Sequence, residues 1–471
     1  MNVLSVTSEC VPLIKTGGLA DVAGALPKAL APLGIDMRTL LPAYQAIAQT
    51  EGEVVMRFDD LMGGAAELRQ CQVAEHTVYL LVAPHLYQRG GGPYVDEFGH
   101  DYHDNAERFA ALCQVAAYIA RDGINGSWTP DVMHCHDWQA GLTPLYCKLH
   151  DCTQPSILTI HNMAFQGVFD PSVMEPLGLP AWVYSADHIE YYGKISTLKA
   201  AMVFADKITT VSPTYAQELA DPHFGMGLEG VIQKRAADVL GILNGIDTDT
   251  WDPETEAYPY GRTTLKRKAT AKAALAKEFE LDGTGPIAIV VSRLSQQKGL
   301  DLLLDALPDY LDQGGELALL GSGDPALEHT FRELRNRYPG KVGVEIGYNE
   351  GLSHRMFAGG DMVLIPSRFE PCGLTQLYGL RYGTLPVVSR TGGLADTVIH
   401  ANHAALNANV ATGFVCNANS ASALSGVLNH ALALYQTPKR WQALQRNAMK
   451  QSVDWSVSAS AYAALYQSLI E

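Results

Sequence analysis

Short apolar runs rich in β-branched residues alternate with longer helix-like segments along most of the chain, and this alternation constrains the fold more than any other feature. In the first half the predicted strands are 2–6, 37–41, 77–82, 131–135, 156–160 and 207–211, and the helix-like segments include 19–33, 105–120 and 138–149. The strands are apolar without alternation, which is typical of strands that helices cover on both faces. The first half therefore predicts a parallel α/β sheet.

The alternation of predicted strands and helices is interrupted near residues 244–285 and then resumes. The stretch NGIDTDTWDPETEAYPYG has turn residues and no periodicity, so it predicts a connection between domains. A basic helix follows, and we expect its charges to form a solvated face: Arg262, Lys266, Arg267, Lys268, Lys272 and Lys277. Further strands are predicted at 287–292, 316–320, 342–346 and 361–366, and residues 421–471 have a helical pattern. The sequence thus predicts two doubly wound α/β domains, 1–243 and 244–455.

Composition narrows the class of protein. Apolar residues make up 47% of the chain, which excludes a disordered protein. No apolar stretch reaches the ~20 residues of a membrane helix, so we expect no membrane insertion. The net charge of −16 argues against nucleic acid or an anionic membrane as partner, because both reward a basic surface. A small anionic substrate held by a few local cations remains compatible with it.

The N-terminus and the cysteines indicate a cytoplasmic protein. No basic residue precedes Lys15, so the start does not resemble a secretory signal. The eight cysteines are scattered without CxxC spacing, which predicts reduced, mostly buried thiols. In residues 134–137 (HCHD) the strand period puts His134 and His136 on one face and Cys135 on the other, so we expect no metal site there.

A glycine pair in residues 15–21 (KTGGLAD) is the first candidate for a substrate contact. Two glycines before a helix let backbone N–H groups approach an anion, and Lys15 adds a compact positive charge. Taken alone, an ordinary tight turn explains the motif at least as well. Residues 16–21 recur identically at 391–396, after Arg390 in place of Lys15, which indicates similar turns in two similar domains.

Two loops in the second half follow predicted strands. Residues 292–301 (SRLSQQKGLD) place Arg293 and Lys298 beyond the carboxyl end of a strand, where α/β sheets bind ligands and where two cations could hold a diphosphate. Residues 366–376 (PSRFEPCGLTQ) place Glu370 on a turn between prolines, where a carboxylate can bind sugar hydroxyls. A solvated loop and a helix-dipole charge are the structural alternatives.

The ends of two strands in the first half carry polar residues. His161 and Asn162 end strand 156–160, and His136, Asp137 and Trp138 end strand 131–135. A hydrogen-bonded structural histidine is the alternative to a substrate contact. Two neighbouring polar strand ends favour a binding site.

Together these motifs resemble the glycogen/starch synthase family. KTGGLADV, HCHDW, TIHN, VSPTYA, LNGID, SRLSQQKGLD, PSRFEPCGLTQLYGL and RTGGLADTV occur in the family's order over essentially the whole chain. The resemblance implies a B-type glycosyltransferase fold of two Rossmann-like domains with the active site between them. It also implies that the C-terminal helix, 456–471, packs back on the first domain.

The resemblance further implies the reaction. Family members transfer glucose from ADP-glucose to the non-reducing end of an α-1,4-glucan, glycogen or a malto-oligosaccharide, with retention of configuration and without metal or cofactor. The expected catalytic residues are Asp137, His161, Arg293, Lys298 and Glu370. The expected substrate-binding residues are Lys15, Thr16, Gly17, Gly18, Asp21, Asn162, Asn244, Tyr348, Cys372, Gly373, Leu374 and Thr375, of which Tyr348 would stack on adenine.

Some alternatives remain open at this point. The wider superfamily often has a second glutamate where this chain has Tyr378, so no role of a second carboxylate carries over. Cys10 and Cys372 flank the expected site and predict sensitivity to thiol reagents. Rival functions are another nucleotide-sugar enzyme of the same fold, such as a 2-epimerase, a UDP-glucose-dependent transferase, and a catalytically silent glucan- or nucleotide-binding regulator.

Overall fold

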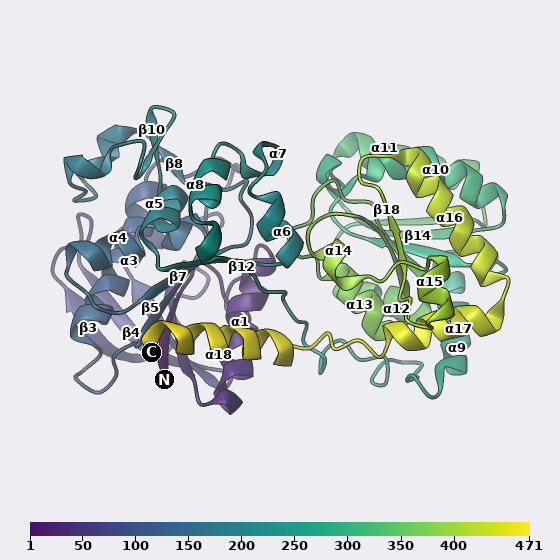
Figure 1. Cartoon of the computed structure of the whole chain (residues 1–471), viewed down its shortest axis with the longest axis horizontal. Helices are drawn as coiled ribbons and strands as arrows, with labels where there is room; N and C mark the ends of the chain where they lie inside the picture. The colour runs from purple at the N-terminus through teal and green to yellow at the C-terminus, as the bar shows by residue number, and fades with distance from the viewer. The chain divides into compact units, whose positions relative to one another are not determined.

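A computed structural model describes all 471 residues, and the chain forms two compact units (Figure 1). Unit 1 comprises residues 1–244 and 455–471, and unit 2 comprises residues 245–454. No helix in either unit is long and apolar enough to cross a bilayer.

The core of unit 1 is a nine-stranded sheet in the order β12-β11-β7-β6-β1-β2-β5-β4-β3. Its strands are β1 Asn2–Val6, β2 Asp36–Pro42, β3 Glu53–Phe58, β4 Ala66–Val73, β5 His76–Val82, β6 Val132–His136, β7 Ser156–Ile160, β11 Lys207–Thr210 and β12 Val239–Gly241. The strands from β12 to β5 pair in parallel, whereas β4 and β3 are antiparallel. The prediction of a purely parallel sheet is therefore wrong at this edge, because β3 and β4 mix polar and apolar residues and lack the apolar runs used to find strands.

Helices cover both faces of the unit 1 sheet. They are α1 Gly18–Leu30, α2 Pro84–Tyr87, α3 Asn105–Asp122, α4 Thr143–Leu149, α5 Thr197–Phe204, α6 Pro213–Glu218, α7 Pro222–Gly225, α8 Glu229–Lys234 and α18 Ser456–Ile470. A small antiparallel sheet is formed by β8 Val168–Phe169, β9 Glu190–Tyr191 and β10 Lys194–Ser196. The helix predicted at 138–149 is split, because a 3-10 turn at Trp138–Ala140 precedes α4.

The C-terminal helix α18 is part of unit 1 and lies beside α1 (Figure 1). Successive residues of β1 divide between two cores, since strand side chains alternate. Leu4 packs in the core that contains α3 and α4, and Val3 packs in the core that contains α1 and α18. Tyr462 and Tyr466 of α18 are fully buried in this second core.

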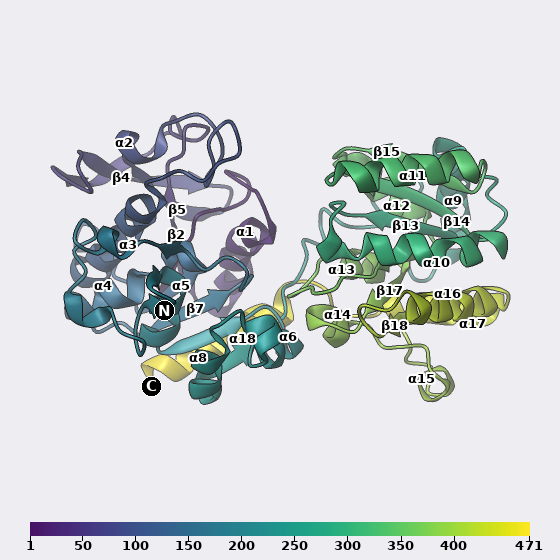
Figure 2. The same ribbon diagram turned by 90° about the horizontal axis from the view of Figure 1, so that it is seen from above.

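Unit 2 has a six-stranded, wholly parallel sheet in the order β15-β14-β13-β16-β17-β18. Its strands are β13 Ile287–Val291, β14 Glu316–Gly321, β15 Val342–Ile346, β16 Met362–Ile365, β17 Leu385–Ser389 and β18 Phe414–Cys416. Its helices are α9 Lys268–Glu278, α10 Leu300–Asp312, α11 Pro325–Arg337, α12 Glu350–Gly359, α13 Thr375–Tyr382, α14 Gly392–Thr397, α15 His403–Asn407, α16 Ala421–Tyr435 and α17 Pro438–Ala448. Helices α10 and α16 lie side by side along this unit (Figure 2).

The basic helix α9 differs from the solvated face expected of it. Lys268 is buried, and its Nζ donates to the carbonyl oxygens of Phe357 and Ala358 and lies within 3.0 Å of the Tyr260 hydroxyl. Lys272 forms an ion pair of 2.7 Å with Asp361. The clustering of basic residues in the sequence could not predict the burial of Lys268, because long lysine side chains can reach acceptors on other elements.

Candidate functional site

Two loops of unit 2 meet because their strands are neighbours. Strands β13 and β16 pair in parallel, so the loops after their carboxyl ends emerge side by side. Nζ of Lys298, from the first loop, lies 2.6 Å from Oε2 of Glu370, from the second. The Ser367 hydroxyl donates to the same carboxylate oxygen over 2.9 Å. The structure thus brings together two predicted residues and adds Ser367, which the sequence analysis did not single out.

Arg368, in the loop after β16, anchors the loop after β13. Its guanidinium forms a two-pronged ion pair with Asp301, with N–O distances of 2.7 and 2.6 Å, and its Nη1 also donates to the carbonyl oxygen of Gln296. Such pairs are geometrically specific as well as strong. Arg293 lies in the same loop and is exposed. The Ser292 hydroxyl donates to its backbone carbonyl oxygen, whereas its guanidinium has no hydrogen bond or ion pair within the protein. Its guanidinium is therefore free to bind an anion beside Lys298.

The second glycine pair of the chain supports the Glu370 turn. A Cβ atom on Gly392 would lie 2.0 Å from the carbonyl oxygen of Glu370, and one on Gly393 would lie 2.2 Å from that of Cys372. Gly392 also has a positive φ of 42°. Only glycine allows this close approach. In unit 2, the glycines of the repeated TGGLAD motif therefore allow close packing against the Glu370 turn, soon after β17 ends.

The turn leads into α13 as predicted. Gly373 has a positive φ of 73°, Leu374 caps the helix, and Thr375 is its first residue. The side-chain amide of Gln376 donates to the carbonyl oxygens of Cys372 and Gly373. These bonds satisfy the two carbonyl oxygens of the turn, so the start of α13 keeps its conformation without a bound ligand.

Two aromatic residues of unit 2 have different surroundings. Tyr348, after β15, is 85% exposed, and its hydroxyl donates to Glu350 over 3.0 Å. Tyr378 stacks on Trp251 at a ring distance of 3.9 Å, and Trp251 stacks on His354 at the same distance. Tyr378 therefore stands in an aromatic stack where the wider superfamily has a carboxylate.

In unit 1, Asp137 and His161 meet at the adjacent ends of β6 and β7. Oδ1 of Asp137 accepts the backbone N–H of His161 over 2.7 Å. Burial raises the pKa of Asp137 to about 7, against the lowering effect of this bond and of one from Asn162. Asp137 also has φ of 54° and ψ of −166°, a backbone conformation that costs on the order of 1–3 kcal/mol outside glycine. Strain of this kind is concentrated at functional sites.

The two predicted asparagines differ in their bonding. Oδ1 of Asn162 accepts the N–H of Ala164 over 3.0 Å, which closes the turn after β7. Asn244 is buried, and its Oδ1 has no hydrogen-bond partner. Oδ1 of Asn244 is therefore free to accept a hydrogen bond from a ligand.

The first glycine turn is organised by Glu9, a residue that the sequence analysis missed. The Glu9 carboxylate accepts the backbone N–H groups of Thr16 and Gly17, the Thr16 hydroxyl and the Tyr94 hydroxyl. The amides of Thr16 and Gly17, which we expected to face an anion, are therefore engaged in this structure. The only sequence signal for Glu9 is an acidic residue shortly after β1.

Neither packing nor backbone conformation requires a glycine at position 17 or 18. A Cβ atom on Gly17 or Gly18 would contact nothing within 4 Å, and neither residue has a positive φ. Lys15 is half-exposed and forms an ion pair of 2.7 Å with Asp21. Nothing in the protein fills the space beside the two glycines, so a bound molecule can approach their backbone. The strand before this turn, β1, spans Asn2–Val6, as the apolar run at 2–6 predicted.

The cysteines are all free, and all but the partly exposed Cys152 are buried. Burial raises the pKa of Cys10 to about 12, so this thiol has almost no reactive thiolate at neutral pH. Its burial and raised pKa argue against the predicted reactivity of Cys10 with thiol reagents. Cys372 is 6% exposed.

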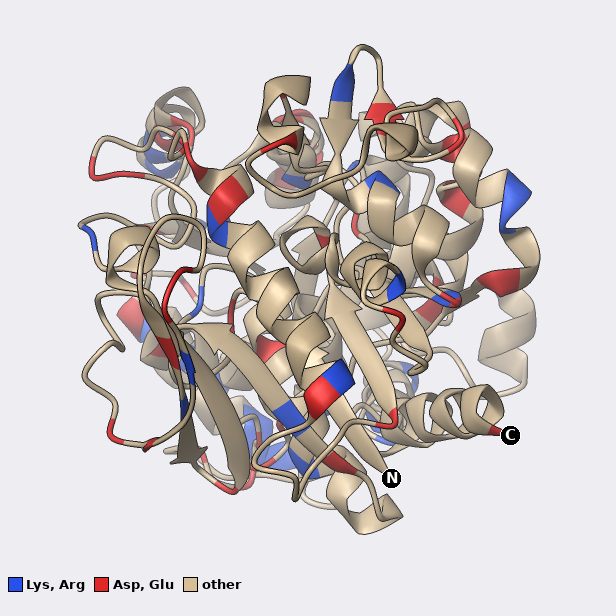
Figure 3. Cartoon of the chain, turned by 90° about the vertical axis from the view of Figure 1, so that its left-hand side faces the viewer, with Lys and Arg blue, Asp and Glu red and all other residues tan.

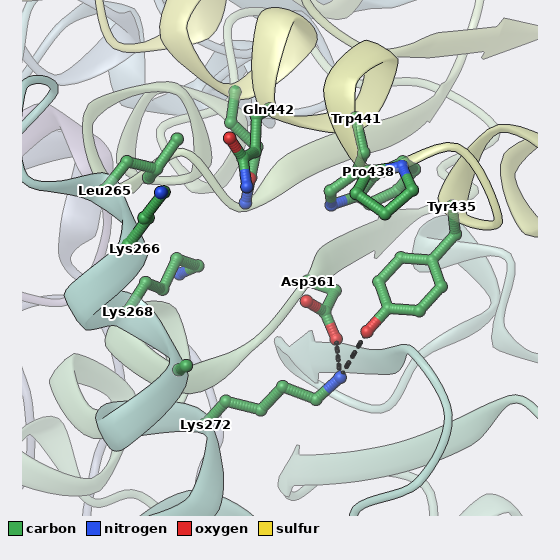
Figure 4. A pocket seen from close by; sticks show the side chains of 11 residues that line it. Leu265, Lys266, Lys268, Lys272, Asp361, Tyr435, Pro438, Trp441 and Gln442 are labelled. Carbon is green, nitrogen blue, oxygen red and sulfur yellow. Dashed lines mark hydrogen bonds and ion pairs between the residues drawn. The ribbon is translucent and has the colours of Figure 1, made fainter.

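A pocket of about 280 Å³ lies in unit 2 away from these loops. Figure 4 shows Lys272 reaching across it to Asp361 and Tyr435, beneath Trp441 and Gln442. Burial lowers the pKa of Lys268, beside it, to about 7. The ammonium groups of Lys268 and Lys272 are already hydrogen-bonded, and no predicted site residue lines the pocket.

Lys and Arg positions are scattered among Asp and Glu positions over the side of unit 1 that faces the viewer in Figure 3, without a continuous basic stripe. The positive charge of the candidate site is therefore local. In unit 2 it consists of Arg293 and Lys298, and in unit 1 the glycine turn carries Lys15.

Comparison with known proteins decides the family. Residues 2–234 match the family model for the starch synthase catalytic domain, and residues 272–448 match that for glycosyl transferases group 1. The glycogen synthase of Cereibacter sphaeroides (strain ATCC 17023) is 55% identical over 472 residues, which cover 100% of this chain and 98% of the relative. The chain belongs to the glycogen synthase family. The glycogen synthase of Paracoccus denitrificans is 54% identical over 99% of both chains.

A solved structure of a family relative has the same fold. The catalytic domain of starch synthase IV from Arabidopsis thaliana, bound to ADP and acarbose, matches with a TM-score of 0.86 and 29% identity over 99% of both chains. As a member of the glycogen synthase family, the chain is a glycosyltransferase with the expected B-type fold of parallel sheets and helices.

Proposed function

We propose that the protein transfers glucose from ADP-glucose to the non-reducing end of an α-1,4-glucan, with retention of configuration. The observation that carries this proposal is the free guanidinium of Arg293 in the loop that also carries Lys298, which pairs with Glu370 of the neighbouring loop. The two cations, Arg293 and Lys298, suit the diphosphate of a sugar diphosphate donor, and the Glu370 carboxylate suits the hydroxyls of its sugar. The starch synthase IV relative, whose structure contains ADP, supports the choice of nucleotide.

Arg293 and Lys298 have different tasks in this proposal. Arg293 can bind two phosphate oxygens at once, whereas Lys298 acts as a point charge. The leaving diphosphate gains charge as its bond to the sugar breaks, and fixed cations stabilise that charge. We propose that these groups, with Lys15 in unit 1, replace a metal ion, so that chelators leave the activity unchanged. Tyr348 is proposed to stack on the adenine, and Cys372 and Gly373 to shape the turn beneath the sugar.

The proposed reaction needs no nucleophile from the enzyme. The bond between C1 of glucose and the diphosphate oxygen breaks, and a bond from C1 to the acceptor 4-hydroxyl oxygen forms on the same face. The hydroxyl proton passes to the departing diphosphate. In unit 1, Asp21, Asp137, His161, Asn162 and Asn244 are proposed to bind the glucose and acceptor sugars, and Lys15, Thr16, Gly17 and Gly18 to contact the diphosphate and glucose.

One assay tests the proposal against its rivals. The protein is incubated with glycogen and either ADP-glucose or UDP-glucose, and nucleotide release and chain growth are measured. We expect ADP release with chain growth. Preference for UDP-glucose would overturn the donor, nucleotide release without chain growth would indicate another sugar-nucleotide enzyme, and binding without release would indicate a regulator. We expect the protein in the cytoplasm, where both substrates would be found.

A further inference from the structure

The unit 1 sheet carries a polar strip on the face that α1 and α18 cover. Near the amino ends of the strands this face is apolar, as at Val3 and Ile157. Nearer the carboxyl ends the residues are polar. Register pairs Ser5 with His134 and His136 with Thr159, so these side chains share the face. The strip consists of Ser5, His134, His136, Thr159 and Thr209, and all five are buried.

The strip connects to His161 through two hydrogen bonds in series. Oγ of Ser5 lies 3.1 Å from Nε2 of His136, and Nδ1 of His136 lies 3.1 Å from Nε2 of His161. Ser5 and His136 are 1% and 0% exposed, so water does not compete for these bonds. The His161 main chain is held independently, by its N–H bond to Asp137.

Both imidazoles of this series are neutral. Burial lowers the pKa of His161 to about 3 and that of His136 well below its usual value. A neutral imidazole has one nitrogen that donates and one that accepts. One of the two facing nitrogens of His136 and His161 therefore carries a hydrogen and the other does not.

The Ser5 hydroxyl determines the direction of donation. Its oxygen has His136 Nε2 as its hydrogen-bond partner, and no other group accepts its hydrogen. If His136 carried its hydrogen on Nε2, the Ser5 hydroxyl hydrogen would be buried without an acceptor, which is costly. Ser5 therefore donates to Nε2 of His136, and Nδ1–H of His136 donates to Nε2 of His161. The remaining hydrogen of His161 is on Nδ1.

We infer that Ser5 and His136 are positioning residues that hold His161 as the Nδ1–H tautomer, which donates a hydrogen bond to a sugar oxygen of the substrate. Nδ1 of His161 has no partner within the protein, and the residue is partly exposed. Because the hydrogen of His161 is already fixed on Nδ1, the donor loses no freedom when the substrate binds. Nδ1 also cannot act as a hydrogen-bond acceptor instead. The role of this donor in transfer rests on the proposed function, whereas the tautomer does not.

The tautomer is tested in the free enzyme by NMR of ¹⁵N-histidine-labelled protein. Spectra that correlate ring nitrogens with carbon-bound hydrogens distinguish Nδ1–H from Nε2–H, and the His161→Gln spectrum assigns the signals. We expect Nδ1–H in the wild type and a mixture of tautomers in Ser5→Ala. Ser458→Ala is the matched control, because it also removes a buried serine hydroxyl, which donates to the Leu243 carbonyl oxygen in the same unit.

Kinetics test the consequence. We expect His136→Phe to lower kcat about a hundredfold, the lower end of the range for loss of one preorganised donor, and Ser5→Ala to lower it about tenfold, because the His136 donor remains; KM should change little. His136→Gln retains an amide donor and is expected to restore part of kcat. An Nε2–H tautomer in the wild type, or unchanged tautomer and kcat in Ser5→Ala, would overturn the inference. Failure of glucan transfer by the wild type would instead refute the proposed function, and the spectra would still decide the tautomer.

Discussion

Nζ of Lys298 donates to Oε2 of Glu370 over 2.6 Å, and this bond joins the loop after β13 to the loop after β16. Both side chains are largely buried, with exposed fractions of 19% and 11%. A buried pair of this kind is a weak source of net stability, but removal of one partner leaves the other charge uncompensated. The pair can therefore be tested for stability and for catalysis separately.

We expect Lys298→Met and Glu370→Gln each to lower kcat by about 10²–10³-fold, the range for loss of one preorganised electrostatic contact. Each single variant should also unfold at a lower temperature, because it leaves one buried group without its partner. The double variant should recover stability but not activity. Thermal unfolding and initial rates of nucleotide release measure the two effects.

The control for this pair is Lys272→Met. The Lys272–Asp361 pair has a similar N–O distance of 2.7 Å and similar exposed fractions of 16% and 10%, but it lies away from the two loops. We expect this variant to be destabilised with kcat unchanged. Recovery of activity in the Lys298/Glu370 double variant, or normal turnover in either single variant, would refute the catalytic assignment.

The two TGGLAD motifs give a second prediction, since their glycines differ in surroundings. Gly17→Ala and Gly18→Ala should fold with an unchanged unfolding temperature, because an added Cβ meets nothing within 4 Å. They should nevertheless lower kcat/KM by tenfold or more if substrate approaches this backbone. Initial rates over a range of donor concentration measure this loss.

The matched pair in unit 2 should behave in the opposite way. Gly392→Ala and Gly393→Ala place a Cβ about 2 Å from a carbonyl oxygen of the Glu370 turn. Overpacking of this kind costs about 1–3 kcal/mol or more, so we expect a lower free energy of unfolding in urea. If the unit 1 variants also lost stability while keeping full activity, the assignment of Gly17 and Gly18 to substrate would be wrong.

These glycines show what the sequence could predict and what it could not. Strand β7 lies where its apolar run predicted it, at 156–160, because a strand buried on both faces has a continuous apolar sequence. The edge strand β15 also lies where it was predicted, at 342–346, although Glu345 is exposed. The identical motifs at 16–21 and 391–396 predicted similar turns, yet one glycine pair adjoins open space and the other packs on backbone. Such a difference depends on contacts between segments far apart in the chain.

The same limit applies to the charged residues. Motif order predicted Lys298 and Glu370, but their pairing depends on the adjacency of β13 and β16. Nothing in the sequence distinguishes Lys268 from the exposed Lys277 on α9, because the buried ammonium of Lys268 binds acceptors more than 80 residues away in sequence. Glu9 was missed because its partners are the backbone amides of a loop, which carry no side-chain signature.

Asp137 gives a prediction with a definite sign in pH. Its folded pKa, about 7, lies above the unfolded value of 3.8, so its contribution to stability is complete below pH 3.8 and is lost as pH rises through 7. Asp137→Asn keeps a side-chain oxygen for the His161 N–H but cannot ionise. The unfolding temperature of this variant relative to wild type should therefore increase between pH 4 and pH 8.

The activity of Asp137→Asn should show the complementary change. If the ionised carboxylate assists transfer, the variant loses most kcat above pH 7 and least below pH 6. An unfolding temperature that follows wild type at every pH would show that the carboxyl group does not titrate near neutrality in the folded protein.

The buried histidines have the opposite sign. Burial lowers the pKa of His134 and of His161 to about 3 and that of His136 well below 6.5, so the unfolded chain binds protons that the folded chain does not. Stability should therefore fall as pH drops from about 6.5 towards 3, and Asp137 offsets this in part over the same window. His134→Asn should reduce the pH slope of the unfolding free energy by about 1.4 kcal/mol per pH unit, the value for one proton.

Thiol labelling separates reactivity from proximity to the site. Cys10 lies near the first glycine turn but is fully buried with a pKa of about 12, whereas Cys152 is partly exposed and a hydrogen bond from Cys147 lowers its pKa. Because thiolate and access together set the rate, we expect maleimide to modify Cys152 first, with no loss of activity. Peptide mass spectrometry over time measures the order, and Cys152→Ser should abolish the fast phase. Rapid inhibition that persists in Cys152→Ser but disappears in Cys372→Ser would show instead that the Glu370 turn opens often enough to expose its thiol.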